Sequence, residues 1–102
     1  MKKAWLLATI ILHAGALALF SAGAADAACY ADYKAKRDNP LRLHYGVMKL
    51  PDAICAARRD PVPAVERRLE KHRWTLLTVL SVFGEEGLQD RKESAGEFFL
   101  RF

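Results

Sequence analysis

The chain has 102 residues, a net charge of +4 and a hydrophobic share of 52%. This length limits the protein to one small domain with a small core. Its charges are interspersed, as in residues 66–71, instead of clustering on one face with aromatic residues between them, which argues against a nucleic-acid partner. Such a mixed run is typical of a solvated helix face.

Residues 1–27 have the layout of a secretory signal peptide. Two lysines provide a positive start, residues 5–20 form an apolar run, and Ala25-Asp26-Ala27 matches a small-residue cleavage site. The apolar run is shorter than the ~20 residues that a membrane-spanning helix needs. We therefore expect cleavage after Ala27, no stable membrane anchor, and a mature domain of residues 28–102 that is periplasmic or secreted. The alternatives are an uncleaved anchor and an earlier cleavage at residues 22–24.

Cys29 and Cys55 are the only two cysteines, and both lie in the predicted mature domain. In an exported protein an even pair favours a disulfide. Closing a loop of about 27 residues stabilises a fold by roughly 3.5 kcal/mol in the chain-entropy model. We predict a Cys29–Cys55 disulfide that ties the N-terminal segment to the connection after the first strand. Two buried free cysteines are the alternative.

The first half of the mature chain predicts one strand between two short helices. Residues 28–37 are expected to form a short helix, and Asp38-Asn39-Pro40 marks a turn. Apolar residues then alternate from Leu41 to Leu50, which indicates a strand. Residues 52–59 are rich in alanine and predict one helical turn.

The second half predicts a longer helix followed by two strands. Residues 60–63 combine an acidic cap with prolines in the first helical turn, and Val62, Val65 and Leu69 recur at helical spacing. Residues 74–83 are apolar on both faces, which indicates a central strand. Residues 84–96 predict a long loop with an optional helix at 88–95, and residues 97–102 predict a final strand.

This order of elements predicts the α+β class, as a small β-α-β-β domain. Its three-stranded antiparallel sheet would carry one main helix on one face, with the N-terminal segment held by the disulfide. A helix that returns the chain between two strands leaves them parallel, with room for a third strand between them. The simplest arrangement places residues 97–102 in the middle. The alternative places residues 74–83 there.

One face of this sheet is predicted to remain uncovered. The helix is expected to cover the face with Leu43, Tyr45, Leu76, Leu80, Phe98 and Leu100. The opposite face would then carry Arg42, His44, Met48, Thr75, Leu77, Val79, Phe99 and Arg101. Exposed apolar patches often mark partner surfaces, so we predict a partner or dimer face here. A core covered by the N-terminal segment or by residues 84–96, or a small-molecule site, are the alternatives.

The chain lacks the common catalytic motifs: it has no Gly-rich phosphate loop, H-E-x-x-H, C-x-x-C-H or G-x-S-x-G. Its two mature histidines, His44 and His72, lie on different predicted elements, so we expect neither a metal site nor a cofactor. The sequence therefore predicts an exported, non-enzymatic interaction or binding module that meets a periplasmic protein or a second copy of itself. The alternative is a small periplasmic hydrolase or isomerase that uses His44 with Arg42 or Arg101.

The C-terminal part resembles a family of short bacterial domains of unknown function. In that family a helix leads into a Gly-Trp-Glu-Leu-Val strand, and the domain ends on an aromatic strand with a basic residue near its end. The corresponding residues here are Leu69, the strand Trp74-Thr75-Leu76-Leu77-Thr78-Val79, and the end Phe98-Phe99-Leu100-Arg101-Phe102. Arg73 stands where the family has Gly, a residue that suits a left-handed helix end. The resemblance implies a fold and a small exported bacterial protein, without a specific activity.

Overall fold

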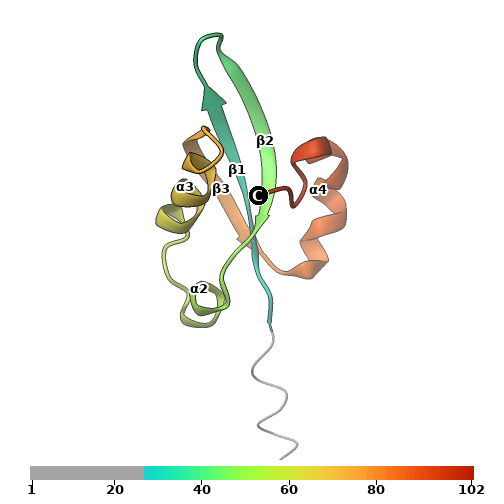
Figure 1. Ribbon diagram of the computed structural model, residues 1–102. Helices are drawn as coiled ribbons and strands as arrows, with labels where there is room; N and C mark the ends of the chain where they lie inside the picture. Colours follow the sequence, from blue (N-terminus) through green and yellow to red (C-terminus); the bar gives the residue numbers. More distant parts are fainter. Residues whose placement is uncertain (1–26) are drawn as a thin grey trace, which may run out of the picture.

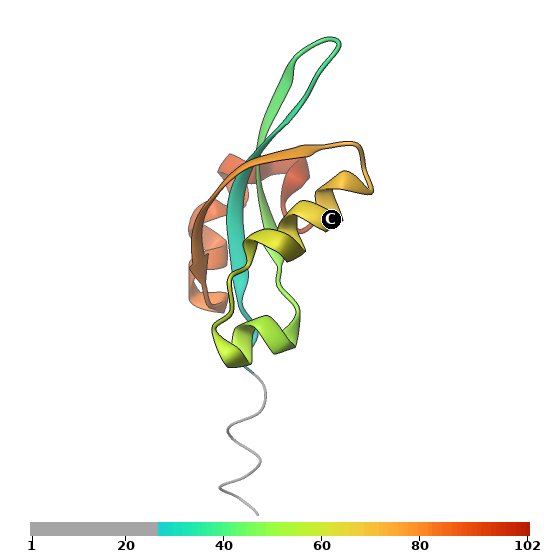
Figure 2. The same cartoon turned by 90° about the vertical axis from the view of Figure 1, so that its left-hand side faces the viewer.

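The computed structural model describes residues 27–102, in which three antiparallel strands form one sheet with helices on both faces (Figures 1 and 2). The predicted signal peptide lies outside the described residues, apart from Ala27. Helices α2 and α3 lie on one side of the sheet and α4 lies on the other (Figure 1). The chain is thus an α+β protein with a three-stranded antiparallel sheet, as predicted. Within residues 27–102, no helix is long and apolar enough to cross a membrane.

The N-terminal segment forms the central strand, which corrects two predictions. Strand β1 (Tyr30–Arg37) pairs with β2 (Arg42–Lys49) on one side and with β3 (Thr75–Phe83) on the other. The expectation of two parallel strands flanking an antiparallel third strand is confirmed, but the central strand is not residues 97–102. The predicted helix at 28–37 is wrong because this segment alternates: Ala31, Tyr33 and Ala35 are all buried on one face.

Strand β3 lies at the edge of the sheet, so the alternative that placed residues 74–83 in the middle is also wrong. Its ladder with β1 contains two register shifts, which leave Leu77 and Leu80 without partners on β1. Both side chains are about half exposed. Although β3 is apolar along its length, only some of its side chains pack against the core, and others are exposed at the edge of the sheet.

The first two helices follow their predicted positions. Helix α2 (Asp52–Ala57) carries Cys55, which forms the predicted disulfide with Cys29 at an S–S distance of 2.02 Å. Helix α3 (Val62–Glu70) begins after Asp60, whose Oδ1 accepts a hydrogen bond of 3.0 Å from the Val62 amide. Beyond the end of α3, Arg73 has a φ of 63°. The left-handed residue expected at this position is therefore present without a glycine.

The C-terminal segment is not a strand, contrary to prediction. A 3-10 turn η1 (Glu85–Gly87) leads into α4 (Leu88–Ala95), the predicted optional helix, and a second 3-10 turn η2 (Gly96–Phe98) follows. Gly96 and Leu100 both have positive φ, at 54° and 57°, and such angles are incompatible with an extended strand. Only one parallel bridge joins this segment to the sheet, between Phe99 and Val47.

The two faces of the sheet build two separate apolar clusters. The cluster on the α3 side consists of Ala31, Tyr33, Ala35, Met48, Leu50, Val65, Leu69 and Trp74. The cluster on the α4 side is smaller and consists of Tyr30, Val47 and Ala95, with Tyr45, Phe83, Leu88 and Phe99 packed against it. Phe98 and Phe102 join the first cluster while Phe99 joins the second, so the C-terminal segment contacts both.

Candidate functional site: an arginine–aromatic pocket

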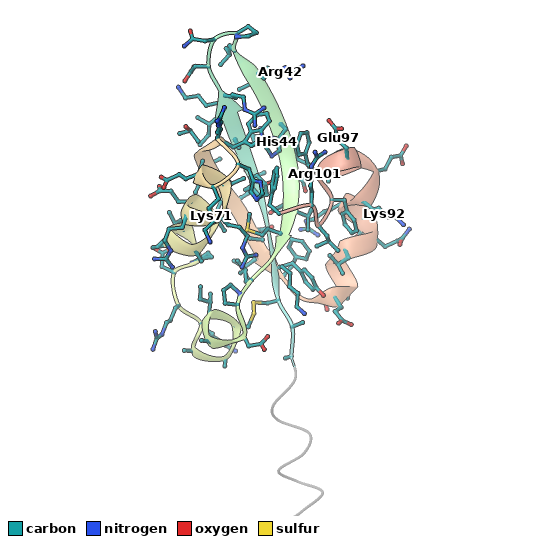
Figure 3. The ribbon with its side chains drawn as sticks, in the orientation of Figure 1. Arg42, His44, Lys71, Lys92, Glu97 and Arg101 are labelled. Carbon is teal, nitrogen blue, oxygen red and sulfur yellow. A yellow bond between two sulfur atoms is a disulfide. The ribbon has the colours of Figure 1, made fainter. Side chains whose placement is uncertain are left out.

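A pocket of about 290 Å³ lies where the β1–β2 hairpin, the residues after α3 and the C-terminal segment meet. We call it the arginine–aromatic pocket, and it is lined by Arg37, Arg42, His72, Trp74, Glu97, Phe98, Arg101 and Phe102. Figure 3 shows Arg42, Arg101 and Glu97 extending from different elements around this region, with His44 nearby. Elements that are distant in the sequence therefore contribute the lining.

Aromatic rings form the floor of the pocket. Phe98 stacks on His44 with ring centroids 3.7 Å apart, and Trp74 meets the same imidazole edge to face at 4.3 Å. His72 stacks on Phe102 at 4.6 Å. Trp74 is only 7% exposed, so its ring is held by packing on several sides. Aromatic contacts of this kind restrict the rings to defined positions, which makes the floor rigid.

Arginine side chains form the rim. Arg37 and Arg42 lie directly opposite each other across the two strands of the hairpin. Like charges in this position destabilise a sheet. The Arg37 guanidinium lies 4.2 Å from the Trp74 ring centroid and donates a hydrogen bond of 2.7 Å to the His72 carbonyl. Among residues 27–102, neither arginine has a carboxylate partner.

Glu97 is the one acidic residue in the lining. Its carboxylate lies 3.7 Å from Arg101, and both side chains are more than half exposed. An exposed pair at this spacing contributes little stability, because water screens it and both side chains lose mobility. Arg101 is therefore readily available to another anion. Three arginines against one glutamate leave the rim with an excess of positive charge.

His44 does not line the pocket itself, but its ring supports the floor by packing against Phe98 and Trp74. Burial, followed by the charges of Arg37 and Arg101, lowers the pKa of His44 from 6.5 to about 4. Its Nε2 lies 2.9 Å from the Tyr33 hydroxyl, a hydrogen bond in either tautomer, while Nδ1 is buried without a partner among the described residues. Tyr33 reaches His44 by crossing over Gly46, where an added Cβ would lie 2.6 Å from the Tyr33 Cζ.

The predicted partner face is not a single surface. His44 and Met48 are buried on the α3 side, and Val79 packs against the same cluster. Helix α3 therefore covers the side of β2 opposite to the one predicted, and leaves Leu43 66% exposed. The physical reason is that β1, which was not expected to be a strand, sets the register and the facing of β2.

The remaining members of that face are dispersed. Phe99 packs into the α4-side cluster, whereas Thr75 and Leu77 are exposed on β3. Only Arg42 and Arg101 come together, on the rim of the arginine–aromatic pocket. Sequence reasoning missed the other lining residues: Arg37, His72, Trp74, Glu97, Phe98 and Phe102. The sequence could have indicated the role of Arg37, because Arg37 and Arg42 flank the predicted turn at residues 38–40. The two arginines would lie opposite each other in a β-hairpin with its turn at these residues.

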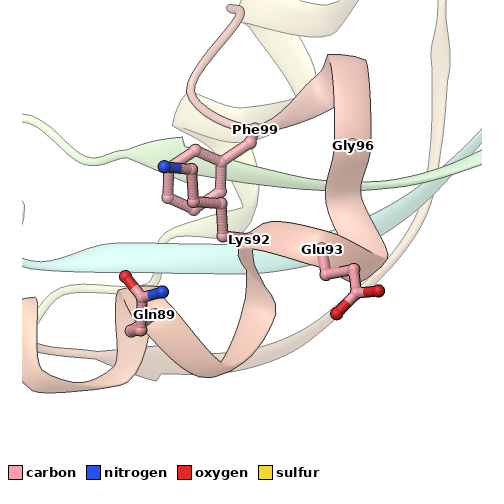
Figure 4. Close-up of a pocket in the computed structure, with 5 residues that line it drawn as sticks. All are labelled: Gln89, Lys92, Glu93, Gly96 and Phe99. Atoms are coloured by element: carbon pink, nitrogen blue, oxygen red, sulfur yellow. The ribbon is translucent and has the colours of Figure 1, made fainter.

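A second depression on the surface is less suited to binding a charged ligand. A more open depression of about 600 Å³ lies beside α4 and is lined by Gln89, Lys92, Glu93, Gly96 and Phe99 (Figure 4). Its single cation and single anion balance each other. Within residues 27–102, no three side chains of the kinds that ligate metals come together.

Comparison of the chain with protein-family models, with curated proteins and with solved structures finds no match. The resemblance of residues 65–102 to a short bacterial domain family stays a prediction. Inference about function therefore depends on the chemistry of the pocket.

Proposed function

We propose that the protein is an exported binding module whose arginine–aromatic pocket takes an anionic group of a partner protein. One observation carries this proposal: Arg37, Arg42 and Arg101 converge over a rigid aromatic floor with a single exposed carboxylate among them. The layout of residues 1–27 and the disulfide support export, because disulfides persist in oxidising compartments.

The geometry suits a carboxylate on an apolar stem. A guanidinium presents two parallel N–H groups that match the two oxygens of a carboxylate. An anion between Arg37 and Arg42 would also relieve the repulsion of this cross-strand pair. The rings below would contact the carbon atoms that carry the carboxylate. Acidic residues next to an aromatic or aliphatic residue in a partner protein combine both features.

The alternative of a hydrolase or isomerase is less well supported. Such an enzyme would need a ring nitrogen of His44 within reach of a substrate proton. Here the ring is 8% exposed, lies against Phe98 and Trp74, and has its Nε2 bonded to Tyr33. These contacts favour a binding role for the site.

Fluorescence titration can test the binding proposal. Trp74 is the only tryptophan among residues 27–102, and it forms part of the pocket. Protein recovered from the periplasm after expression of the full chain would be titrated with acetyl-Gly-Phe-Asp-Glu-Gly-amide and with its neutral Asn-Gln counterpart. We expect the acidic peptide to shift Trp74 emission at lower concentration, with an affinity that falls as salt is added.

Two variants locate the binding site. Arg42→Gln should weaken binding of the acidic peptide about tenfold, since it removes one charged hydrogen-bond donor. Arg67→Gln removes the same charge from an exposed position on α3 that does not line the pocket, and should leave binding unchanged. Equal affinity for the two peptides, or equal losses in the two variants, would contradict the proposal.

A further inference from the structure

The tip of the β1–β2 hairpin projects beyond the helices and beyond β3 (Figures 1 and 2). Residues 38–43, which form the turn and the start of β2, are all exposed. Two of them are leucines: Leu41 is 65% exposed and Leu43 is 66% exposed, the highest values for large apolar residues within residues 27–102. The most exposed apolar side chains of the domain therefore lie on its most prominent projection.

The two leucines lie next to a third on the part of the sheet that α4 leaves uncovered. Helix α4 packs on this face farther from the hairpin tip, around Val47. Leu43 of β2 and Leu77 of β3 line an open hollow of about 270 Å³ between that region and the tip. Single exposed leucines are common on protein surfaces, but a group of them at one end of a molecule indicates an interaction surface.

Positive charges lie beside these leucines. Lys36 is directly opposite Leu43 in the hairpin, and Lys34 lines the same hollow as Leu43. Lys34 is exposed and forms no ion pair with any residue that the structure describes. Lys36 pairs only with Asp38, at 3.4 Å, in an exposed contact that water screens. Residues 34–43 thus contain four cations, two lysines and two arginines, against one acidic residue.

We propose that the hairpin tip docks reversibly on an anionic phospholipid membrane. Leu41 and Leu43 would enter the boundary between headgroups and acyl chains, while Lys34 and Lys36 contact lipid phosphates. Peripheral proteins bind membranes by this combination of buried apolar area and attraction to anionic lipids. A projecting tip suits a soft, extended surface, whereas a small molecule requires a concave site.

This docking does not rest on the arginine–aromatic pocket. The side chain of Arg42, between the two leucines in sequence, lines that pocket, whereas Leu43 lines the hollow on the other face of the hairpin. A variant at the leucines can therefore lose membrane binding and keep binding of the acidic peptide. Failure of one proposal leaves the other standing.

Co-sedimentation with vesicles measures the docking. Protein recovered from the periplasm after expression of the full chain is mixed with vesicles of phosphatidylglycerol and phosphatidylcholine in equal parts, or of phosphatidylcholine alone. We expect the anionic vesicles to bind half of the protein at a lipid concentration at least about tenfold lower, and added salt to weaken this binding. Equal binding to both vesicles would overturn the proposal. Absence of binding up to about 1 mM lipid would also overturn it, in favour of an acidic protein surface as the occupant.

Leucine variants test insertion. Leu41→Ser should raise the lipid concentration for half binding at least about tenfold, because it removes an apolar side chain that leaves water on docking. The matched control is Leu80→Ser, at a half-exposed leucine of β3 away from the hairpin, which should bind as the original protein does. Circular dichroism checks that both variants are folded. Equal losses in the two variants, or full binding by Leu41→Ser, would overturn insertion of the tip.

Charge variants test the orientation even if Leu41→Ser fails to fold. Lys34→Gln should raise the lipid concentration for half binding about fivefold, whereas Lys49→Gln, at the opposite end of β2, should leave it unchanged. Asp38→Asn removes the one acidic residue of the tip and should lower this concentration about threefold. Equal effects of the two lysine variants, or weaker binding by Asp38→Asn, would overturn docking through the hairpin.

Discussion

The two faces of the sheet are stabilised by different forces. On the α3 face, large side chains such as Tyr33, Met48 and Leu69 are almost completely buried, and α3 contributes two fully buried residues. On the α4 face, the central feature is a buried carboxylate, Asp32, which accepts hydrogen bonds from Tyr45, Ser81 and Arg91. The first face depends on apolar area, which is non-directional. The second depends on directional bonds that are costly when incomplete.

This difference indicates how each helix is attached. Helix α3 is held by Val65 and Leu69, which pack into a core shared with all three strands. Helix α4 contributes little apolar surface, and its Arg91 reaches across the face to Asp32 at 3.1 Å. Disruption of the α3 face should therefore unfold the whole domain, whereas disruption of the α4 face should first release α4.

The largest effect is expected for Trp74→Ala, on the α3 face. Truncation of a buried tryptophan costs about 3–5 kcal/mol, and here it also removes the ring contacts to His44 and Phe98. Urea denaturation should show this loss as a lower midpoint. Leu43→Ala changes an exposed leucine and should shift the free energy of unfolding by less than about 0.5 kcal/mol. Similar midpoints for the two variants would contradict the assignment of Trp74 to the core.

Acidification should weaken the same face through His44. The unfolded chain binds a proton at this imidazole as pH falls through 6.5, whereas the folded protein, whose His44 pKa is about 4, does not. The unfolded state is therefore favoured progressively over this interval. The free energy of unfolding should fall by up to about 3 kcal/mol between pH 7 and pH 4.

His44→Phe provides the control for this pH dependence. The variant lacks the Tyr33 hydrogen bond at every pH, and this loss changes the free energy of unfolding by the same amount at each pH. The decrease in the free energy of unfolding between pH 7 and pH 4 should therefore largely disappear, because the variant has no imidazole at this position. Asp32 does not produce this fall. Burial would raise the pKa of Asp32, but hydrogen bonds from Ser81, Tyr45 and Arg91 lower it below 3.8, so its contribution is lost only at more acidic pH. An unchanged pH dependence in His44→Phe would contradict the role of His44.

Much of the α3 side could be predicted from the sequence. The proline-rich start and the spacing of Val65 and Leu69 define α3, and cysteine parity in an exported chain predicts the disulfide. These features are local, or follow from composition. The sheet required more, because residues 30–37 show only a short alternation of apolar and charged residues. Their role as central strand depends on pairing with β2 and β3, which are distant in sequence.

The candidate site was predictable only in part for the same reason. Arg42 and Arg101 were identified, but their partner Arg37 lies on the strand that was taken for a helix. Phe98 and Phe102 were expected to alternate with Phe99 along a strand. Positive φ angles at Gly96 and Leu100 instead turn the segment so that these rings join the floor around His44. Such turns are set by tertiary packing, and no local pattern indicates them.

The smallest effect is expected for Asp32→Asn, on the α4 face. The change removes the charge that pairs with Arg91 and weakens the hydrogen bonds from Tyr45 and Ser81, which should cost about 1–3 kcal/mol. Because Arg91 provides the polar link between α4 and the sheet, amide exchange should accelerate most in residues 88–95. Exchange in α3 should change only as far as global stability falls.

Asp38→Asn is the matched control for this experiment. It removes the same charge from an exposed pair, in which Asp38 lies 3.4 Å from Lys36 in the hairpin turn, and should change stability by less than about 0.5 kcal/mol. If Asp32→Asn instead accelerates exchange equally in α3 and α4, the two faces unfold as one unit. The separation of an apolar face from a polar face would then describe the packing of the domain but not its local stability.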